Sequence, residues 1–230
     1  MNVHDKVNFI LQELDSLFPA PQFPLECKND FTFLVAVMLS AQCTDAMVNK
    51  VTKKLFATCD SPEKMISLGE DRLKEIIRPC GFFNSKARAI LETSKSILSK
   101  YNGTVPKTFR ELEQLRGVGH KTASVVMSRC FNEPAFPVDT HISRLANRWG
   151  LSGSKNVKII ENDLKSLFPE NTWNRLHIQM ILYGRKYCPA RGHIIENCPI
   201  CKKICQQSLI NEPNKINLTK KMELHQSLKT

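Results

Sequence analysis

The sequence predicts an all-α fold. Apolar residues recur at three- and four-residue intervals over most of the 230 residues, which is the spacing of one helix face. No segment combines sustained strand-like alternation with the turn residues of a β-hairpin. Residues that favour helix starts, such as Ser61 before Pro62, precede several of these patterns. We therefore expect helices packed on helices, without a sheet.

The helices expected in the first half of the chain are separated by short breaks. Residues 3–18 form one apolar stripe, which closes at Pro19. Asp30 is a candidate cap for residues 31–39, a run so continuously apolar that periodicity does not separate a buried helix from a buried strand. After Thr44, the apolar residues Val48, Val51 and Leu55 again recur at helical spacing. Further breaks are expected at Gly69, at Pro79-Cys80-Gly81 and at Asn84.

Helical patterns continue in the second half. Thr108 and Glu111 have the spacing of a capping box just before a Gly-Val-Gly turn. Ser154 precedes a helical pattern over residues 157–167. A last pattern spans about residues 173–187.

The composition favours a polyanionic partner. The chain has 33 Lys and Arg against 22 Asp and Glu, a formal charge of +11, which attracts nucleic acid through counterion release. Charge alone also fits a protein with a lysine-rich soluble surface. No apolar run approaches the roughly 20 residues of a membrane span, and the N-terminus lacks signal- and transit-peptide features. We expect a soluble, cytoplasmic protein.

Two segments carry the clearest signs of chemistry. Residues 115–123 read Leu-Arg-Gly-Val-Gly-His-Lys-Thr-Ala, and residues 136–148 place Asp139 at the start of a helical pattern. A Gly-Val-Gly turn leaves backbone N–H groups uncovered at a helix N-terminus, which attracts a phosphate oxygen. Lys121 follows that turn. The Lys121 amine and the Asp139 carboxylate are the two groups needed for attack of an amine on an electrophilic sugar carbon. Taken singly, such a lysine is usually a phosphate contact and such an aspartate an N-cap.

The nine cysteines fall into two groups. Five scattered ones are expected to be small, mostly buried hydrophobic residues in a reducing compartment: Cys27, Cys43, Cys59, Cys80 and Cys130. The other four are clustered as Cys188-x9-Cys198-x2-Cys201-x3-Cys205. Four thiols so close together predict a metal site, and their softness suits either zinc or an iron–sulfur cluster.

These motifs together resemble the endonuclease III family of DNA glycosylases. Residues 115–123 and 136–148 resemble the helix-hairpin-helix, the Gly/Pro-rich loop and the catalytic aspartate of the DNA glycosylases. The four clustered cysteines near the C-terminus point to endonuclease III among these enzymes. Residues 39–45, Leu-Ser-Ala-Gln-Cys-Thr-Asp, and residues 81–86, Gly-Phe-Phe-Asn-Ser-Lys, also resemble family segments. The resemblance spans about residues 5–205.

The resemblance implies two helical domains flanking a DNA-binding cleft, and it favours a helix for the ambiguous apolar run. The first domain would comprise residues 20–131 with the helix-hairpin-helix. Residues 1–19 and 132–210 would form the second, with the metal cluster. Residues 211–230 are polar and are expected to be a mobile tail.

The activity implied is that of a monomeric, bifunctional DNA glycosylase and abasic-site lyase. It would act in base excision repair on oxidised pyrimidines or abasic sites in double-stranded DNA. Lys121 would attack C1′, expel the base and form an imine, and β-elimination would then cut the strand. Asp139 would receive the lysine proton or stabilise positive charge on the sugar. Gln42 would fill the gap left by the extruded base and Phe82 would act as a wedge. The hairpin residues expected at the DNA backbone are Gly117, Val118, Gly119 and His120.

The resemblance also implies a [4Fe–4S] cluster on Cys188, Cys198, Cys201 and Cys205. The usual family spacing has six, two and five residues between successive cysteines, whereas this chain has nine, two and three. Zinc is therefore the alternative. The loop between Cys188 and Cys198 is also longer than in the family. It offers only Arg191 and His193 as cations for a contact with the DNA backbone, so that contact is expected to differ from the family's.

Two other functions compete with this one. An adenine glycosylase would use Asp139 and water alone, but Lys121 and the absence of an extra recognition domain argue against it. A non-catalytic DNA-binding module would use the same hairpin, with both residues structural.

Overall fold

The computed structural model describes residues 2–204. These residues form helices and connecting loops with no β-strand, so the all-α prediction is confirmed. The chain divides into two compact units. We call residues 22–137 the hairpin unit, and residues 1–21 with 138–230 the terminal unit. The expected tail and Cys205 lie outside the described residues.

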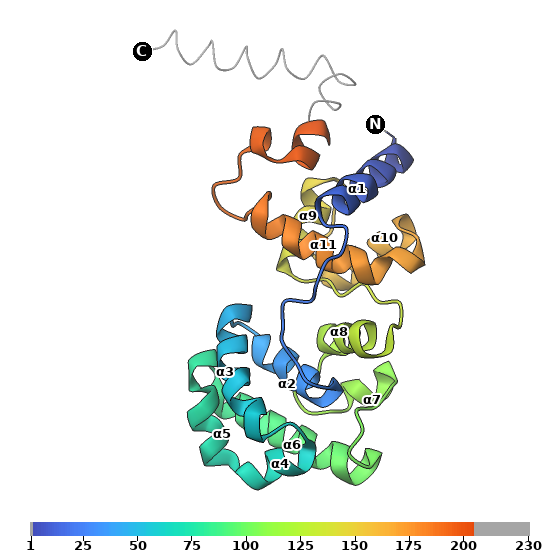
Figure 1. Ribbon diagram of the computed structural model, residues 1–230. Helices are drawn as coiled ribbons and strands as arrows, with labels where there is room; N and C mark the ends of the chain where they lie inside the picture. Colours follow the sequence, from blue (N-terminus) through green and yellow to red (C-terminus); the bar gives the residue numbers. More distant parts are fainter. Residues whose placement is uncertain (1, 205–230) are drawn as a thin grey trace. The chain divides into compact units, whose positions relative to one another are not determined.

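The hairpin unit is built around one buried helix, α2. Its helices are α2 (Asp30–Ser40), α3 (Asp45–Thr58), α4 (Pro62–Leu68), α5 (Glu70–Ile77), α6 (Phe83–Tyr101), α7 (Phe109–Glu113) and α8 (His120–Phe131), with a 3₁₀ turn, η1 (Arg78–Cys80). α2 contacts α3, α6 and α8 (Figure 1). Residues 31–39 of α2 are all buried, which explains why this helix shows no polar face in the sequence.

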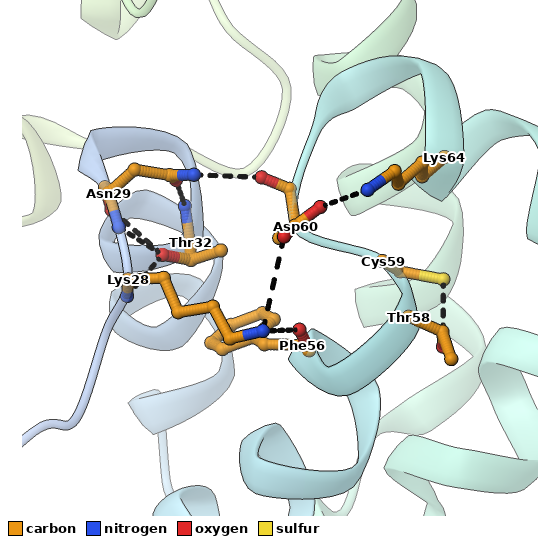
Figure 2. A network of polar contacts seen from close by, with 8 residues as sticks. All are labelled: Lys28, Asn29, Thr32, Phe56, Thr58, Cys59, Asp60 and Lys64. Atoms are coloured by element: carbon orange, nitrogen blue, oxygen red, sulfur yellow. Dashed lines mark hydrogen bonds and ion pairs between the residues drawn. The ribbon is translucent and has the colours of Figure 1, made fainter.

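A polar network fixes the start of α2 against the end of α3 (Figure 2). Asn29, and not Asp30 as expected, is the N-cap, and its side chain forms a capping box with Thr32. Its amide Nδ2 also donates to the carbonyl of Asp60 at 2.9 Å. Lys64 in turn donates to the Asp60 carboxylate at 2.8 Å. Because Asn29 caps one helix and also reaches the loop after another, this loop–helix junction depends on it.

The other helix boundaries follow the sequence signals with one exception. Ser61 caps α4 with Pro62 at its first position, and Thr108 caps α7, as expected. The break expected at Asn84 is wrong, because α6 begins at Phe83 and continues through it. Helix α10 begins at Val157, within the pattern that follows Ser154, and is capped by Asn156.

The terminal unit joins the two ends of the described chain. Its helices are α1 (Val3–Leu17), α9 (Thr140–Arg148), α10 (Val157–Leu167) and α11 (Trp173–Lys186), with 3₁₀ turns η2 (Glu170–Thr172) and η3 (Ile195–Asn197). α11 contacts both α1 and α9 (Figure 1). The amide of Gln179 on α11 donates to the carbonyl of Phe18 at 3.0 Å. Edge-on packing of Trp149 against Tyr183, with ring centroids 5.4 Å apart, fills the core of this unit.

Two further expectations concern the chain as a whole. Of the scattered cysteines, Cys59 and Cys80 are buried and the other three are half-buried, and none of the five is in a disulfide. No helix within residues 2–204 has both the length and the apolarity needed to cross a bilayer.

Candidate functional site

The turn between α7 and α8 depends on Gly117. The backbone N–H of Val118 donates to the carbonyl of Leu115 at 3.1 Å, which closes a four-residue turn. Gly117 occupies its third position with a φ of +78°, a conformation that favours glycine. A Cβ on Gly117 would also lie 3.0 Å from the Cβ of Ala89. Both the backbone conformation and the close approach therefore require glycine.

Gly119 leaves the N-terminus of α8 open. It is the N-cap residue, and no side chain caps the helix. A Cβ on Gly119 would meet nothing within 4 Å, so the path to the first N–H groups of α8 is clear. Val118 is buried, and the exposed His120 pairs with Glu113 at 2.8 Å. The turn therefore presents its backbone, in the geometry of an anion site at a helix N-terminus.

The two predicted catalytic residues lie in different units. Lys121 is exposed and is the second residue of α8, in the hairpin unit. Asp139 is half-buried in the terminal unit and is the N-cap of α9, where its Oδ1 accepts the Ile142 N–H at 2.8 Å. Capping uses one carboxylate oxygen, and an ionised carboxylate has further acceptor capacity on the other.

A pocket of about 370 Å³ in the hairpin unit brings together three of the predicted DNA-contact residues. Gln42, Phe82 and Gly117 all line it. Gln42 lies between α2 and α3, and Phe82 precedes α6 with 64% of its surface exposed. A core role for Phe82 is thereby excluded. A large exposed aromatic side chain at the edge of a pocket is well placed to contact another molecule.

Both of these residues adopt a conformation that is unusual for their type. The φ of Gln42 is +53° and that of Phe82 is +48°. The other non-glycine residues with positive φ within residues 2–204 are Asn102 and Asn132, and asparagine tolerates this region. Positive φ costs glutamine and phenylalanine free energy that the surrounding structure must offset.

Lys86 supplies part of that support. It is buried on α6, and its Nζ donates to three backbone carbonyl oxygens. These belong to Leu39 at 2.9 Å, Ala41 at 2.8 Å and Cys80 at 2.9 Å. Burial lowers the pKa of the Lys86 amine from its ordinary value. One ammonium group thus connects the segment before Gln42 with the segment before Phe82.

Two arginines of α9 reach the chain that follows α11. Arg144 donates to the carbonyl oxygens of Gly184 at 3.0 Å and Cys188 at 3.1 Å. Arg148 donates to the Sγ of Cys188 at 3.1 Å. The helix that begins at Asp139 is therefore tied to the first cysteine of the cluster.

Four side chains near the end of the described chain form a candidate metal centre. The ligand atoms of Cys188, His193, Cys198 and Cys201 all lie within 4.8 Å of one another. The three cysteines are buried and His193 is half-buried. The structure thus brings together three of the four predicted thiols, while the fourth, Cys205, lies outside the described residues.

These thiols could hold an iron–sulfur cluster, as the sequence analysis expects. The described donors differ from the family pattern in one respect, because the fourth is an imidazole and not a thiol. The set also contains the donor types of a structural zinc site. The described group is therefore an incomplete match to a four-thiolate cluster.

Neither Lys86 as a residue of the site nor His193 as a residue of the metal centre was predicted from the sequence. Lys86 ends a segment that resembles the family, but its carbonyl partners are up to 47 residues away in the chain. His193 stands midway between Cys188 and Cys198, with four residues between it and each cysteine. That symmetrical spacing was the available signal, and a histidine between two cysteines is a common zinc-site pattern.

Comparison with known proteins identifies the family. Residues 35–170 match the family model of the HhH-GPD superfamily base excision DNA repair protein. The endonuclease III of Rickettsia felis is 46% identical over 200 residues, covering 87% of this chain and 93% of the relative. That of Bacillus subtilis is 38% identical over 203 residues, covering 88% and 92%.

Solved structures agree with the sequence relatives. A trapped covalent intermediate of an endonuclease III with DNA, in an estranged-adenine complex, has a TM-score of 0.83 and 39% identity, covering 87% of this chain and 94% of that one. A non-covalent endonuclease III–DNA complex has a TM-score of 0.84 and 38% identity, covering 90% and 99%. The chain therefore belongs to the endonuclease III family, the base excision repair DNA glycosylases with a helix-hairpin-helix.

Proposed function

We propose that the protein is a bifunctional DNA glycosylase and abasic-site lyase that removes oxidised pyrimidines from double-stranded DNA. The observation that carries this proposal is the position of Lys121. It is exposed, and it lies two residues after Gly119 at the uncapped N-terminus of α8. A phosphate bound at that terminus would bring the deoxyribose of a damaged nucleotide towards an amine.

Lys121 would carry the covalent step. Its neutral amine attacks C1′ of the damaged nucleotide, and the bond between C1′ and the base breaks with its electron pair going to the base, which gains a proton. Loss of a proton from the nitrogen and opening of the sugar ring give an imine. Removal of a proton from C2′ then breaks the bond between C3′ and its phosphate oxygen, and water hydrolyses the imine.

Asp139 would act in the same reaction through its carboxylate. Its carboxylate accepts the proton from the Lys121 amine or stabilises positive charge on the sugar. Because Asp139 also caps α9 through Oδ1, its position is held by the helix that it begins. The cap and the catalytic role are compatible, since a carboxylate has acceptor sites on two oxygens.

Extrusion of the base would be stabilised by the pocket of the hairpin unit. Gln42 would occupy the space that the base leaves in the stack, and Phe82 would wedge against the opposite strand. Their positive φ values are consistent with residues held ready at a functional site. We further propose that a single chain acts alone on DNA in the cytoplasm, with damaged or abasic duplex as its partner.

Two separate assays test this function. The protein is incubated with a duplex containing one oxidised pyrimidine, and free base and cut strand are measured independently. We expect both products, with a cut 3′ to the lesion. Base release without strand cutting would support a monofunctional glycosylase and overturn the lyase assignment. Binding with neither product would indicate a non-catalytic module.

A further inference from the structure

The metal centre differs from the family pattern in two ways. Its cysteine spacing is nine, two and three residues instead of six, two and five. Its fourth ligand among the described residues is His193, which lies within 4.8 Å of the sulfur atoms of all three cysteines. The longer first loop is the segment that supplies this histidine, so the two departures have one structural explanation.

The separation of the donors fits a single metal ion. The Sγ atoms of Cys188 and Cys201 lie 3.8 Å apart. With zinc–sulfur bonds of about 2.3 Å and tetrahedral angles, two sulfurs on one zinc ion are about 3.8 Å apart. In a [4Fe–4S] cluster each thiolate binds a different iron at a corner of the cube, so the sulfurs must stand farther apart than two ligands of one ion. The Cys188–Cys201 pair has the spacing of the smaller site, and all four ligand atoms lie within 4.8 Å of one another.

His193 needs a partner that a metal ion would supply. Its Nε2 is buried and has no hydrogen bond of standard geometry within residues 2–204, although the imidazole interacts with the thiol of Cys198. A buried nitrogen without a hydrogen bond lowers the free energy of unfolding, because its lost hydration is not replaced. Imidazole nitrogen is a regular zinc ligand, and three cysteines with one histidine form a closed tetrahedral set. These four side chains complete such a set without Cys205.

The surroundings of the sulfur atoms suit bound thiolates. Arg148 donates to the Sγ of Cys188 at 3.1 Å. The hydroxyl of Tyr183 lies 3.2 Å from the Sγ of Cys198 and accepts the backbone N–H of Ile200 at 2.9 Å. With its acceptor side occupied, the hydroxyl is free to donate to sulfur. Donors outside the ligand set orient metal ligands and partly offset the negative charge of thiolates.

We propose that the protein holds one zinc ion on Cys188, His193, Cys198 and Cys201 in place of a [4Fe–4S] cluster. All four positions are taken by protein, so the ion has no open site and its role is structural. It closes the loop of residues 188–198 onto α9 and α11 through Arg148 and Tyr183. The inference stands on the metal site alone and does not depend on the lyase chemistry.

Metal analysis of the full chain tests this inference. The protein is expressed with both iron and zinc supplied, purified without oxygen and without chelators, and analysed for zinc, iron and acid-labile sulfide. We expect one zinc per chain, no sulfide and no broad visible absorption. Iron and sulfide in the proportions of a [4Fe–4S] cluster would overturn the proposal.

Two matched variants distinguish the ligand sets. His193→Ala should lower the bound zinc several-fold, whereas Cys205→Ala should retain it. The reverse pattern, with Cys205 required and His193 dispensable, would contradict the proposal. If His193→Ala does not fold, X-ray absorption at the zinc edge of the parent protein decides the question. Three sulfurs near 2.3 Å and one nitrogen near 2.0 Å are expected, and four sulfurs would overturn the assignment of His193.

Discussion

The Nζ of Lys86 lies 2.8 Å from the carbonyl oxygen of Ala41, the residue just before Gln42. The same atom bonds the carbonyl of Cys80, two residues before Phe82. Lys86→Met keeps the length of the side chain but removes all three bonds. We expect a loss of roughly 2–3 kcal/mol of unfolding free energy, because buried carbonyls lose their donor.

The same substitution should also weaken binding to damaged duplex by about tenfold, equivalent to roughly 1.4 kcal/mol, since both loops lose their support. Ser94→Ala is the matched control, because it removes a buried hydrogen bond from the same helix, to the carbonyl of Ile90. Urea unfolding and fluorescence anisotropy measure the two effects. Equal affinity of Lys86→Met and Ser94→Ala for damaged DNA would show that Lys86 only stabilises the fold.

Gly119→Val should weaken DNA binding by about tenfold, on damaged and undamaged duplex alike, because it would obstruct the N–H groups that we propose contact phosphate and not bases. Gly119 is the position to change, since it has open space and an ordinary φ of −93°. Gly117 is unsuitable because substitution there strains the backbone. Gly153→Val, at another glycine with nothing within 4 Å, is the control. Unchanged affinity of Gly119→Val in a titration would mean that the hairpin is only a structural turn.

Asp139→Asn separates the two roles of this residue. Asparagine caps a helix about as well as aspartate, so we expect the unfolding free energy to change by less than about 0.5 kcal/mol. The rate of base release should fall by about a hundredfold or more, because the amide cannot accept the proton. Asp139→Ala should lose about 1 kcal/mol of stability as well. If Asp139→Asn keeps the full rate under single-turnover conditions, Asp139 is chiefly a helix cap.

Asn29→Ala tests the network of Figure 2. The change removes the cap bond to the Thr32 N–H and the bond to the carbonyl of Asp60, each 2.9 Å long. We expect the unfolding free energy to fall by about 1–2 kcal/mol. Lys53→Ala, at an exposed position of α3, should change it by less than about 0.5 kcal/mol. Equal denaturation midpoints for the two variants would show that the network is not stabilising.

Helices with one face in the core and the other in solvent were predictable from the sequence. It was ambiguous at α2, because a helix buried on every side shows no periodicity, and the family resemblance resolved it. The cap position of α2 was wrong by one residue. Asparagine and aspartate are nearly equivalent as caps, so local sequence alone does not rank neighbouring candidates.

The site was predictable where a motif is continuous in sequence, as at the hairpin. It was not predictable where one side chain joins distant segments. Lys86 resembles a solvated lysine until its carbonyl partners are known, and those partners depend on the packing of α6 against the end of α2. His193 was interpreted as a cation for DNA, because nothing local shows that the chain brings its ring to the three thiols.

Borohydride trapping on a duplex with one abasic site tests the account most directly, because reduction converts an imine between protein and DNA into a stable bond. The parent protein should give a covalent adduct that maps to Lys121. Lys121→Gln should give none while still binding the duplex, and Lys107→Gln, at another exposed lysine of the hairpin unit, should react like the parent. An undiminished adduct in Lys121→Gln, or none with an active parent, would contradict the account.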